Sequence, residues 1–558
     1  MPLVPGSLRR TLLVVVTVAI AGGSFIALRV GSGGSPAATT PTPSGPITAG
    51  GPGPTLPTTA IPSAAVVTSN PSPSAAASQV TASPATPRIA LVPVVGFWST
   101  VRSTSRTELA ALMDGTSRRF GRVVVTAADV AAVATTLGVG SASAVRVSSP
   151  AAVLAAVRAR TDVIGVVHAD DVDPSVRALS VDGRSLFGDD RVRSLASWPL
   201  MIPARTPQAT SDASPVPSTF DPSSTWTVVA AGDVMNDREV YRRAILGHAG
   251  PDFPWDGGTA RIVGRRCCVG GLTTVTARRT GHQGAVRALF QGADLALVNH
   301  EGPAPERHVY HPSGLVFTFD PSLEKGIRTA GVDVVSLANN HIRNAGSLGV
   351  LQTIRNVRSA GLVPVGAGKD VAAARRPVWS TADGVRVAIL AADAIDLSSA
   401  GATATRPGAA PLEVRQVVGS IRSAKAGGAD VVIVVPHWGV EYTDRPTSFQ
   451  RSAAAAFIAA GADVVLGSHP HWAGALEAIG KGVVVYSMGD FIFDLPRSEQ
   501  TDEGLIVELT FVGRRLAQID LHPTIELDRS QPNLLDPAAD GRIVLDRIRA
   551  ASRRFLAW

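Results

Sequence analysis

Short apolar runs alternate with amphipathic stretches in two parts of the chain, and this pattern predicts α/β structure in both. In the longer part, runs rich in Val, Ile and Leu predict buried strands at 225–231, 294–299, 332–338, 385–392, 430–436, 463–467 and 483–487. In the shorter part, strand-like runs at 122–126 and 163–167 alternate with helix-like runs at 108–113, 127–137 and 150–160. We therefore expect a large layered α/β domain at 225–558 and a small α/β domain at 88–200.

The N-terminal segment 1–30 carries a membrane signal. Residues 11–28 are apolar and uncharged, and they directly follow Arg9 and Arg10. The run is long enough for a spanning helix, and the arginines are expected to stay in the cytoplasm, which places the rest of the chain outside. A secretory signal peptide is the alternative, but Leu28, Arg29 and Val30 interrupt the position of a small-residue cleavage site. We predict a single-pass, uncleaved anchor in the cell membrane, with secretion after cleavage as the alternative.

Two stretches have the composition of linkers. Residues 31–87 consist mostly of Pro, Ser, Thr, Ala and Gly, with almost no charge, and such a segment buries too little apolar surface to offset its chain entropy. A similar stretch at 201–224 separates the two regions predicted to fold. The predicted order is anchor, disordered stalk, small domain, linker and large domain.

Charge and cysteine content exclude several classes of protein. The chain has 558 residues, with 52 Lys and Arg against 45 Asp and Glu, so its net charge is only +7. This is not the charge balance of a nucleic-acid-binding protein. The two cysteines, Cys267 and Cys268, are adjacent and exclude a disulfide scaffold; outside the cell they form either a vicinal disulfide or two thiols.

Polar residues gather at the predicted C-terminal ends of five strands, where open α/β sheets build their sites. Each cluster has an ordinary explanation as a turn former, a helix cap or a buried histidine, but His469-Pro470-His471 places two imidazoles side by side after a strand. Carboxylates and imidazoles that converge in this way favour a metal site over five independent turns. The clusters are Asp233, Asn299-His300-Glu301, Asn339-Asn340-His341, His437 and His469-Pro470-His471.

The motifs that contain these residues closely resemble the CapA family, which is linked to poly-γ-glutamate capsule synthesis and shares the calcineurin-like metallophosphoesterase fold. The motifs occur in order from about 226 to 520: GDVM at 232–235, VNHEGP at 298–303, SLANNH at 336–341, PHWGVEY at 436–442, GSHPH at 467–471 and YSMGDFIFD at 486–494. The resemblance implies a four-layer fold, in which two β-sheets pack together with helices outside and a metal site lies at the strand ends.

The resemblance also implies roles for single residues. Asp233 resembles a first-strand metal ligand, Glu301 a carboxylate that bridges two metals, and His471 a ligand of the first metal. Asn340, His437 and His469 resemble ligands of the second metal. His341 would be the general acid that protonates a leaving group. The expected cofactor is one or two divalent transition-metal ions of the Mn, Fe or Zn class, and a pair of such ions activates water.

Several positions depart from the family patterns. Met235 stands where the broader superfamily carries His, and a thioether is a poor ligand for a hard divalent ion. His300 and Asp490 add possible ligands or acid–base groups, while Asn344 and Gly474 remove polar groups that the family carries. A degenerate site is therefore an open alternative. Further candidates for substrate contact or ligand support are Asn299, Asn339, Trp438, Glu441, Tyr442 and Glu477.

The small domain has a weaker resemblance, to one lobe of type 2 periplasmic substrate-binding proteins, especially phosphate-binding ones. It rests on the runs at 109–116, 161–168 and 177–183. A complete binding cleft needs two lobes, so a spacer or docking domain is the alternative.

Three functions remain open at this stage. The first is a membrane-anchored extracytoplasmic protein that assists synthesis or export of an anionic surface polymer through a metal-dependent hydrolytic or transfer step. The second is an extracellular metal-dependent phosphoesterase, and the third is a non-catalytic scaffold. The chain has no GxxxxGK[ST] loop, so ATP-driven polymerisation would need a synthetase or export partner.

Overall fold

The computed structural model describes residues 88–140, 143–204, 220–269, 272–556 and 558. The predicted membrane segment at 11–28 and the stalk at 31–87 lie outside these residues, as does most of the linker. Within the described ranges, no helix combines the length and apolarity that a membrane span requires.

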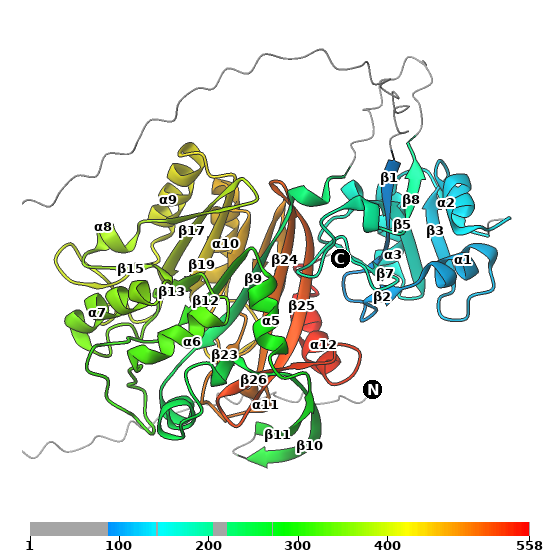
Figure 1. The fold of residues 1–558 in the computed structure, drawn as a ribbon. Coiled ribbons are helices and arrows are strands. Elements are labelled where there is room, and N and C mark those ends of the chain that lie inside the picture. Colours follow the sequence, from blue (N-terminus) through cyan, green and yellow to red (C-terminus); the bar gives the residue numbers. More distant parts are fainter. Residues whose placement is uncertain (1–87, 141–142, 205–219, 270–271, 557) are drawn as a thin grey trace, which may run out of the picture. The chain divides into compact units, whose positions relative to one another are not determined.

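The large domain is built on two sheets (Figure 1). The ten-stranded sheet has the order β11 (Leu272–Gly281), β10 (Thr259–Val269), β26 (Gln531–Leu535), β25 (Arg515–Leu527), β24 (Glu503–Val512), β9 (Thr225–Val234), β12 (Leu295–His300), β13 (Val334–Ser336) and β14 (Val363–Val365), and β23 (Asp490–Ile492) pairs with β9. The six-stranded sheet has the order β16 (Val378–Ala382), β17 (Val385–Asp393), β19 (Val431–His437), β20 (Val464–Leu466), β22 (Gly482–Val485) and β21 (Leu476–Ile479).

Helices cover the outer face of each sheet. The helices of this domain are α4 (Arg238–Tyr241), α5 (Ala285–Gly292), α6 (Glu324–Thr329), α7 (Gly346–Ser359), α8 (Val371–Ala374), α9 (Val414–Ala426), α10 (Ser448–Ala460), α11 (Glu499–Asp502) and α12 (Gly541–Ser552), and a small ladder joins β15 (Ala367–Gly368) to β18 (Gly408–Ala409). Val229 of β9 packs in one core with residues of α5, α6 and α7, whereas Val432 of β19 packs in another with α9 and α10.

The inner faces of the two sheets share the main hydrophobic core. Val228 of β9 and Leu297 of β12 belong to the same buried cluster as Ile389 of β17 and Ile433 of β19. Successive strand residues face opposite sides, so Val228 lies between the sheets while its neighbour Val229 lies under the helices. The order of layers is helix, sheet, sheet, helix, and the predicted α/β class is confirmed.

All seven strands predicted for this domain are present. Strands β9, β12, β13 and β14 run parallel, as do β17, β19, β20 and β22, so the carboxyl ends of each set meet at one edge. The antiparallel strands β24, β25 and β26 and the β10–β11 hairpin were not predicted. Cys267 in β10 is exposed and disulfide-bonded. Of the two alternatives for the cysteines, a disulfide or two thiols, this agrees with the first.

The small domain is a single α/β lobe. Its sheet has the order β4 (Val145–Val147), β3 (Arg122–Thr126), β5 (Val163–His168), β1 (Arg88–Gly96) and β6 (Val176–Ala178), with β8 (Met201–Pro203) also paired to β1, and β2 (Ser103–Thr104) pairs with β7 (Ser180–Val181). Its helices are α1 (Arg106–Asp114), α2 (Val130–Leu137) and α3 (Pro150–Ala159). Helix α2 begins three residues later than predicted, because Asp129 stands at its N-cap. A periplasmic-binding-protein origin for this lobe remains a prediction.

A partly buried ion pair on β24 and β25 gives a testable dependence of stability on pH. His522 Nε2 lies 2.9 Å from Glu508 Oε2, and the other Glu508 oxygen accepts from the Asp189 backbone N–H. Burial alone would lower the pKa of His522. The hydrogen bond and the charge of Glu508 outweigh burial and raise the pKa. The charge of Asp520 adds to the rise, and that of Arg102 opposes it.

A histidine whose pKa is raised by folding stabilises the fold at pH values below its pKa in the unfolded chain, about 6.5. This stabilisation is lost as the pH rises through the pKa of the folded state. We expect His522→Gln to be less stable than the wild type by about 1 kcal/mol at pH 6 and to approach it at higher pH. Urea unfolding of both proteins from pH 5.5 to 9 measures the difference. A difference that stays constant or grows with pH would contradict the assignment.

Candidate metal centre

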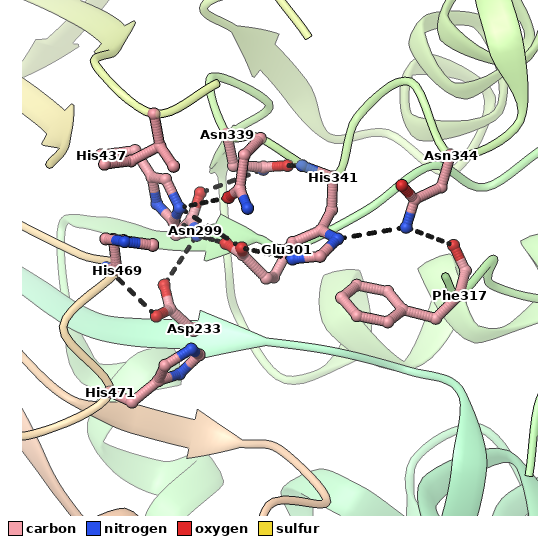
Figure 2. A network of polar contacts seen from close by, with 12 residues as sticks. Asp233, Asn299, Glu301, Phe317, Asn339, His341, Asn344, His437, His469 and His471 are labelled. Atoms are coloured by element: carbon pink, nitrogen blue, oxygen red, sulfur yellow. Dashed lines mark hydrogen bonds and ion pairs between the residues drawn. The ribbon is translucent and has the colours of Figure 1, made fainter. Parts of the chain in front are cut away.

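The strand ends of both sheets bring the predicted site residues together (Figure 2). Asp233 lies in β9, Glu301 follows β12, and His437 ends β19. Each is almost fully buried. Residues 339–341 follow β13, residues 469–471 follow β20, and Asp490 begins β23.

Two groups of three residues have the chemistry and spacing of metal ligands, and they share one carboxylate. In each group, one ligand atom from every residue lies within 4.8 Å of the others. Among the described residues the first group, here called trio A, is Asp233, His471 and Asp490; the second, trio B, is Asp233, Glu301 and His437. Carboxylate oxygen and imidazole nitrogen suit Zn, Mn and Fe class ions, and a shared carboxylate suits two adjacent ions.

Asn299 connects the two carboxylates of trio B. Its side-chain amide donates to Asp233 Oδ1 at 2.7 Å and also to Glu301 Oε2. The second oxygen of Asp233 accepts from the backbone N–H of His469 at 3.3 Å. Asn339 fixes the neighbouring strand end, because its amide donates to the His300 carbonyl at 2.7 Å. These bonds orient ligand oxygens, which is the usual work of residues around a metal.

The carboxylates have the electrostatics of a site that requires cations. Burial raises the pKa of Asp233 to about 6, and the Glu301 carboxylate adds to the rise. Burial likewise raises the pKa of Glu301 to about 8 and that of Asp490 to about 7. The buried Asp490 Oδ2 has no hydrogen-bond partner among the described residues. A divalent cation would neutralise these groups and occupy that oxygen, so the donor set fits a metal.

His471 and Asp490 form the tightest ion pair of trio A. The Nδ1 atom of His471 lies 2.7 Å from Asp490 Oδ1, which leaves Nε2 available. Burial would lower the pKa of His471, but the Asp490 carboxylate outweighs it and raises the pKa to about 9. Asp490 was expected to add a ligand or an acid–base group beside the main ligand set, and the geometry places it in one of the two candidate ligand groups.

Three non-glycine residues around the site have left-handed backbone. The φ angles are 95° for His469, 60° for His471 and 61° for Tyr442, and such conformations concentrate at functional sites. The ring of His469 lies 4.9 Å from that of His437, outside both trios. Burial and the neighbouring histidines lower the pKa of His469 to about 2, so its ring is neutral, as a ligand requires.

Asn340 contacts His437 at the edge of the site. Its side-chain oxygen lies 2.9 Å from His437 Nε2, which is also 3.3 Å from Glu301 Oε1. The structure therefore brings Asn340, His437 and Glu301 together, and with His469 beside them it gathers the whole predicted second-metal set. Their roles as ligands remain predictions.

His341 has one ring nitrogen held and the other facing the site. The Asn344 amide donates to Nδ1 at 3.1 Å and to the Phe317 carbonyl at 3.4 Å, so the ring proton resides on Nε2, which lies 4.0 Å from Glu301 Oε1. Burial, together with the neighbouring His437 and His471, lowers the pKa of His341 to about 3. The ring thus presents an N–H donor to the site, and its role as the general acid stays a prediction.

Four of the predicted supporting residues lie away from the trios. Both nitrogens of His300 are occupied, by the Gly302 carbonyl at 2.9 Å and by buried Glu324 at 2.8 Å. Trp438 is fully buried, and its Nε1 donates to the Tyr486 carbonyl. His300 and Trp438 are therefore engaged within the fold, and their roles as an added ligand and as a substrate contact stay predictions.

Glu477 and Glu441 also differ from expectation. Glu477 accepts from the Tyr486 hydroxyl at 2.6 Å and pairs with Arg451, so its carboxylate is already occupied on β21. Glu441 is exposed, whereas its neighbour Tyr442 is half-buried with its ring parallel to that of His471 at 5.7 Å. Tyr442 alone of this pair contacts a candidate ligand.

Sequence reasoning missed two residues at the site. Asp393 ends β17, pairs in register with His437 and is fully buried, and burial raises its pKa to about 7. It directly follows the predicted strand 385–392, so the rule that found Asp233 could have found it. Arg497 lies over the Tyr442 ring at 4.0 Å, and no sequence signal marked it.

Met235 does not face the trios as a ligand. It is fully buried in an apolar cluster with Phe317, Phe319 and Phe493, and its sulfur accepts from the Asp237 backbone N–H at 3.3 Å. Trio A is complete without it, since His471 and Asp490 supply the donors beside Asp233.

Two packed sheets between helix layers, with carboxylates and imidazoles converging at the strand ends, define a calcineurin-like metallophosphoesterase-type fold. Residues 227–495 match the family of the bacterial capsule synthesis protein PGA_cap.

Two curated relatives carry names from capsule synthesis. The capsule biosynthesis protein CapA of Bacillus anthracis is 31% identical over 237 residues, which cover 42% of this chain and 57% of that protein. The PGA biosynthesis protein CapA of Bacillus subtilis strain 168 is 29% identical over 244 residues, which cover 42% of this chain and 64% of that protein. The match thus spans about three fifths of each relative.

Solved structures give weaker likenesses. The NAD nucleotidase of Haemophilus influenzae covers 58% of this chain and 56% of its own, with 13% identity and a TM-score of 0.33. An ABC-type phosphate transport receptor from Vibrio cholerae covers 21% of this chain and 55% of its own, with 18% identity and a TM-score of 0.19. Both scores lie below 0.5, so the fold assignment rests on this chain's own topology and family match.

Proposed function

We propose that this chain is a membrane-anchored, extracytoplasmic protein that acts in the synthesis or export of an anionic polymer, poly-γ-glutamate, through metal-dependent hydrolysis or transfer at a γ-glutamyl bond. The observation that carries the proposal is the pair of trios sharing Asp233, in a domain that matches the capsule synthesis family. Polymer synthetase or export proteins would be its partners. The anchor is the apolar run at 11–28.

The chain's own residues supply three parts of such a reaction. Trios A and B would hold one or two divalent ions, which when bound polarise a carbonyl and activate water. Hydrolysis places the hydroxyl of water on the carbonyl carbon and a proton on the leaving nitrogen. His341 Nε2–H faces the site and donates a hydrogen bond to developing charge on substrate oxygen, while Asn344 keeps the ring in that tautomer.

Recognition of an anionic substrate has a candidate residue at the edge of trio A. The exposed Arg497 lies 4.0 Å from the Tyr442 ring centroid, and Tyr442 in turn stacks on His471. The guanidinium has no polar side-chain partner among the described residues. A cation held on an aromatic face with its donors free suits a carboxylate next to the cleaved bond.

The test is cleavage of defined substrates by the full chain. Purified protein is supplied with Mn²⁺, Zn²⁺ or Fe²⁺ and given γ-linked glutamate oligomers, and new amino termini are measured. We expect metal-dependent release of amines, abolished by chelator. Release of inorganic phosphate from phosphate esters without amide cleavage would replace the proposal with an extracellular phosphoesterase. Metal binding without any turnover would replace it with a scaffold.

Arg497→Gln tests the recognition step within this assay. Loss of one charge-assisted contact should raise KM for glutamate oligomers by roughly 5- to 20-fold and leave kcat within about twofold. Arg445→Gln is the matched control, because Arg445 is exposed and lies 4.0 Å from Asp444 in the loop after Tyr442. Equal effects of the two variants would remove Arg497 from substrate recognition.

A further inference from the structure

The β10–β11 hairpin projects at the lower end of the ten-stranded sheet in Figure 1, and its two strands carry only positive charge. The segment 259–281 contains five arginines and no Asp or Glu. Strand β11 is the last strand of its sheet among the described residues, so one of its edges is free. The proposed metal centre uses no residue of this hairpin.

The pairing register assigns each arginine to one of the two hairpin faces. Cross-strand partners share a face, and successive residues alternate. Val275 is paired with Arg265 and Ala277 with Ile262, and Val275, Ala277 and Ile262 pack against the main core. These pairs therefore lie on the inner face of the hairpin.

The alternate pairs lie on the outer face. They are Arg261 with Arg278, Gly264 with Thr276, and Arg266 with Thr274. We call Arg261, Arg266 and Arg278, together with the two threonines, the arginine face. Val263, at the register shift between Ile262 and Gly264, is 50% exposed beside it.

The inner and outer arginines differ in their partners. On the inner face, Arg265 pairs with Glu499 at 2.9 Å and Arg279 with Asp528 at 3.0 Å. The three arginines of the outer face are exposed, and their side chains form no hydrogen bond or ion pair with any described residue.

Arg261 and Arg278 stand directly opposite each other, an arrangement of like charges that destabilises a strand pair. An external anion would relieve this repulsion.

The spacing favours a chain over a small ion. Thr274, the partner of Arg266, is four residues from Arg278 in β11, which corresponds to roughly 13 Å along the strand. A single carboxylate or phosphate cannot reach both positions. A polymer with repeated anionic groups can, and a backbone with amides can also bond the free N–H and C=O groups of the β11 edge.

We propose that the arginine face is a docking surface for a polycarboxylate chain, which holds the polymer on the protein independently of the metal centre. The choice of carboxylate over phosphate rests on the proposed function and on the amide-bonding edge of β11. The arginine face increases the local concentration of polymer and catalyses no reaction of its own.

The test compares two triple variants of the full chain in metal-free buffer. The first is Arg261→Gln/Arg266→Gln/Arg278→Gln. The second is Arg415→Gln/Arg422→Gln/Arg553→Gln, which removes the same charge from arginines that are exposed and without a described partner on α9 and after α12. Binding of fluorescent γ-linked polyglutamate is titrated against each, and thermal melts verify that both variants fold.

Each exposed ion contact contributes about two- to fivefold, so we expect the hairpin triple to weaken polymer binding by roughly 10- to 100-fold and the control triple by about twofold or less. The proposal is overturned if both triples weaken binding equally, if the wild type does not bind the polymer, or if inorganic polyphosphate binds this face more tightly than polyglutamate does.

A short γ-glutamyl substrate separates this proposal from the proposed function. Such a substrate does not reach across the arginine face, so the hairpin triple should cleave it as the wild type does. Cleavage with no effect of the triple on polymer binding rejects the docking surface alone. A loss of polymer binding in the triple, with no cleavage by any protein, supports the docking surface and rejects only the hydrolytic step.

Discussion

Replacing Asp233 with alanine is expected to abolish binding of both metal ions and to reduce any hydrolytic activity at least 100-fold. Asp233 belongs to both trios, so its loss leaves two ligands of three in each. His471→Ala removes a ligand of trio A alone and should therefore lose one ion and retain the other. Elemental analysis of the desalted proteins, after incubation with excess Mn²⁺ or Zn²⁺, measures the difference.

Asp463→Ala provides the matched control for this result. Asp463 lies just before the amino end of β20, at the opposite end of that strand from His469, and pairs with Lys425 at 2.8 Å. It should keep full metal content. Retention of both ions by Asp233→Ala would contradict the shared-carboxylate geometry, and loss of both by His471→Ala would contradict the division into two trios.

His341→Ala is expected to lower kcat by roughly 100- to 1,000-fold while the metal content stays unchanged. The ring is outside both trios, and it presents a single hydrogen-bond donor to the site through Nε2. Single-turnover cleavage of a γ-glutamyl oligomer, alongside elemental analysis of the same sample, separates catalysis from metal loading. Loss of metal in His341→Ala would instead make His341 a ligand.

Asn344 variants then identify what the histidine does. Asn344→Ala frees the His341 ring and should lower kcat less than His341→Ala does, because the ring loses only its tautomer preference. Asn344→Asp places a carboxylate at Nδ1, which stabilises the imidazolium and raises the pKa of His341. If the ring acts as the general acid expected from the sequence, the aspartate variant should be faster; if it acts as a neutral donor, the variant should be slower at neutral pH.

The parallel strands could be predicted from sequence, whereas the antiparallel ones were missed. The strand cores 225–231 and 385–392 are mostly apolar, because helices cover one face and the second sheet covers the other. β25 mixes such runs with Gln518, Asp520 and His522, and the β10–β11 hairpin alternates arginine with small residues. These strands depend on their neighbours for pairing, which a single run of sequence does not reveal.

Positions at the site were predicted better than side-chain directions. Asp233 and Glu301 could be found because polar residues after buried strands converge at one edge of a sheet. His300 stands next to Glu301 in the same motif, yet strand alternation turns it toward Glu324 and away from the trios. Arg497 is distant in sequence from Tyr442 and meets it only in the folded chain. The sequence thus located the site but did not define its boundary.

The measurement that tests the account most directly is anomalous diffraction from crystals of the protein grown with Mn²⁺. The account predicts two peaks a few ångströms apart, one within ligand distance of Asp233, His471 and Asp490 and the other within ligand distance of Asp233, Glu301 and His437. A crystal that contains Mn²⁺ elsewhere and shows no peak at either trio would contradict it.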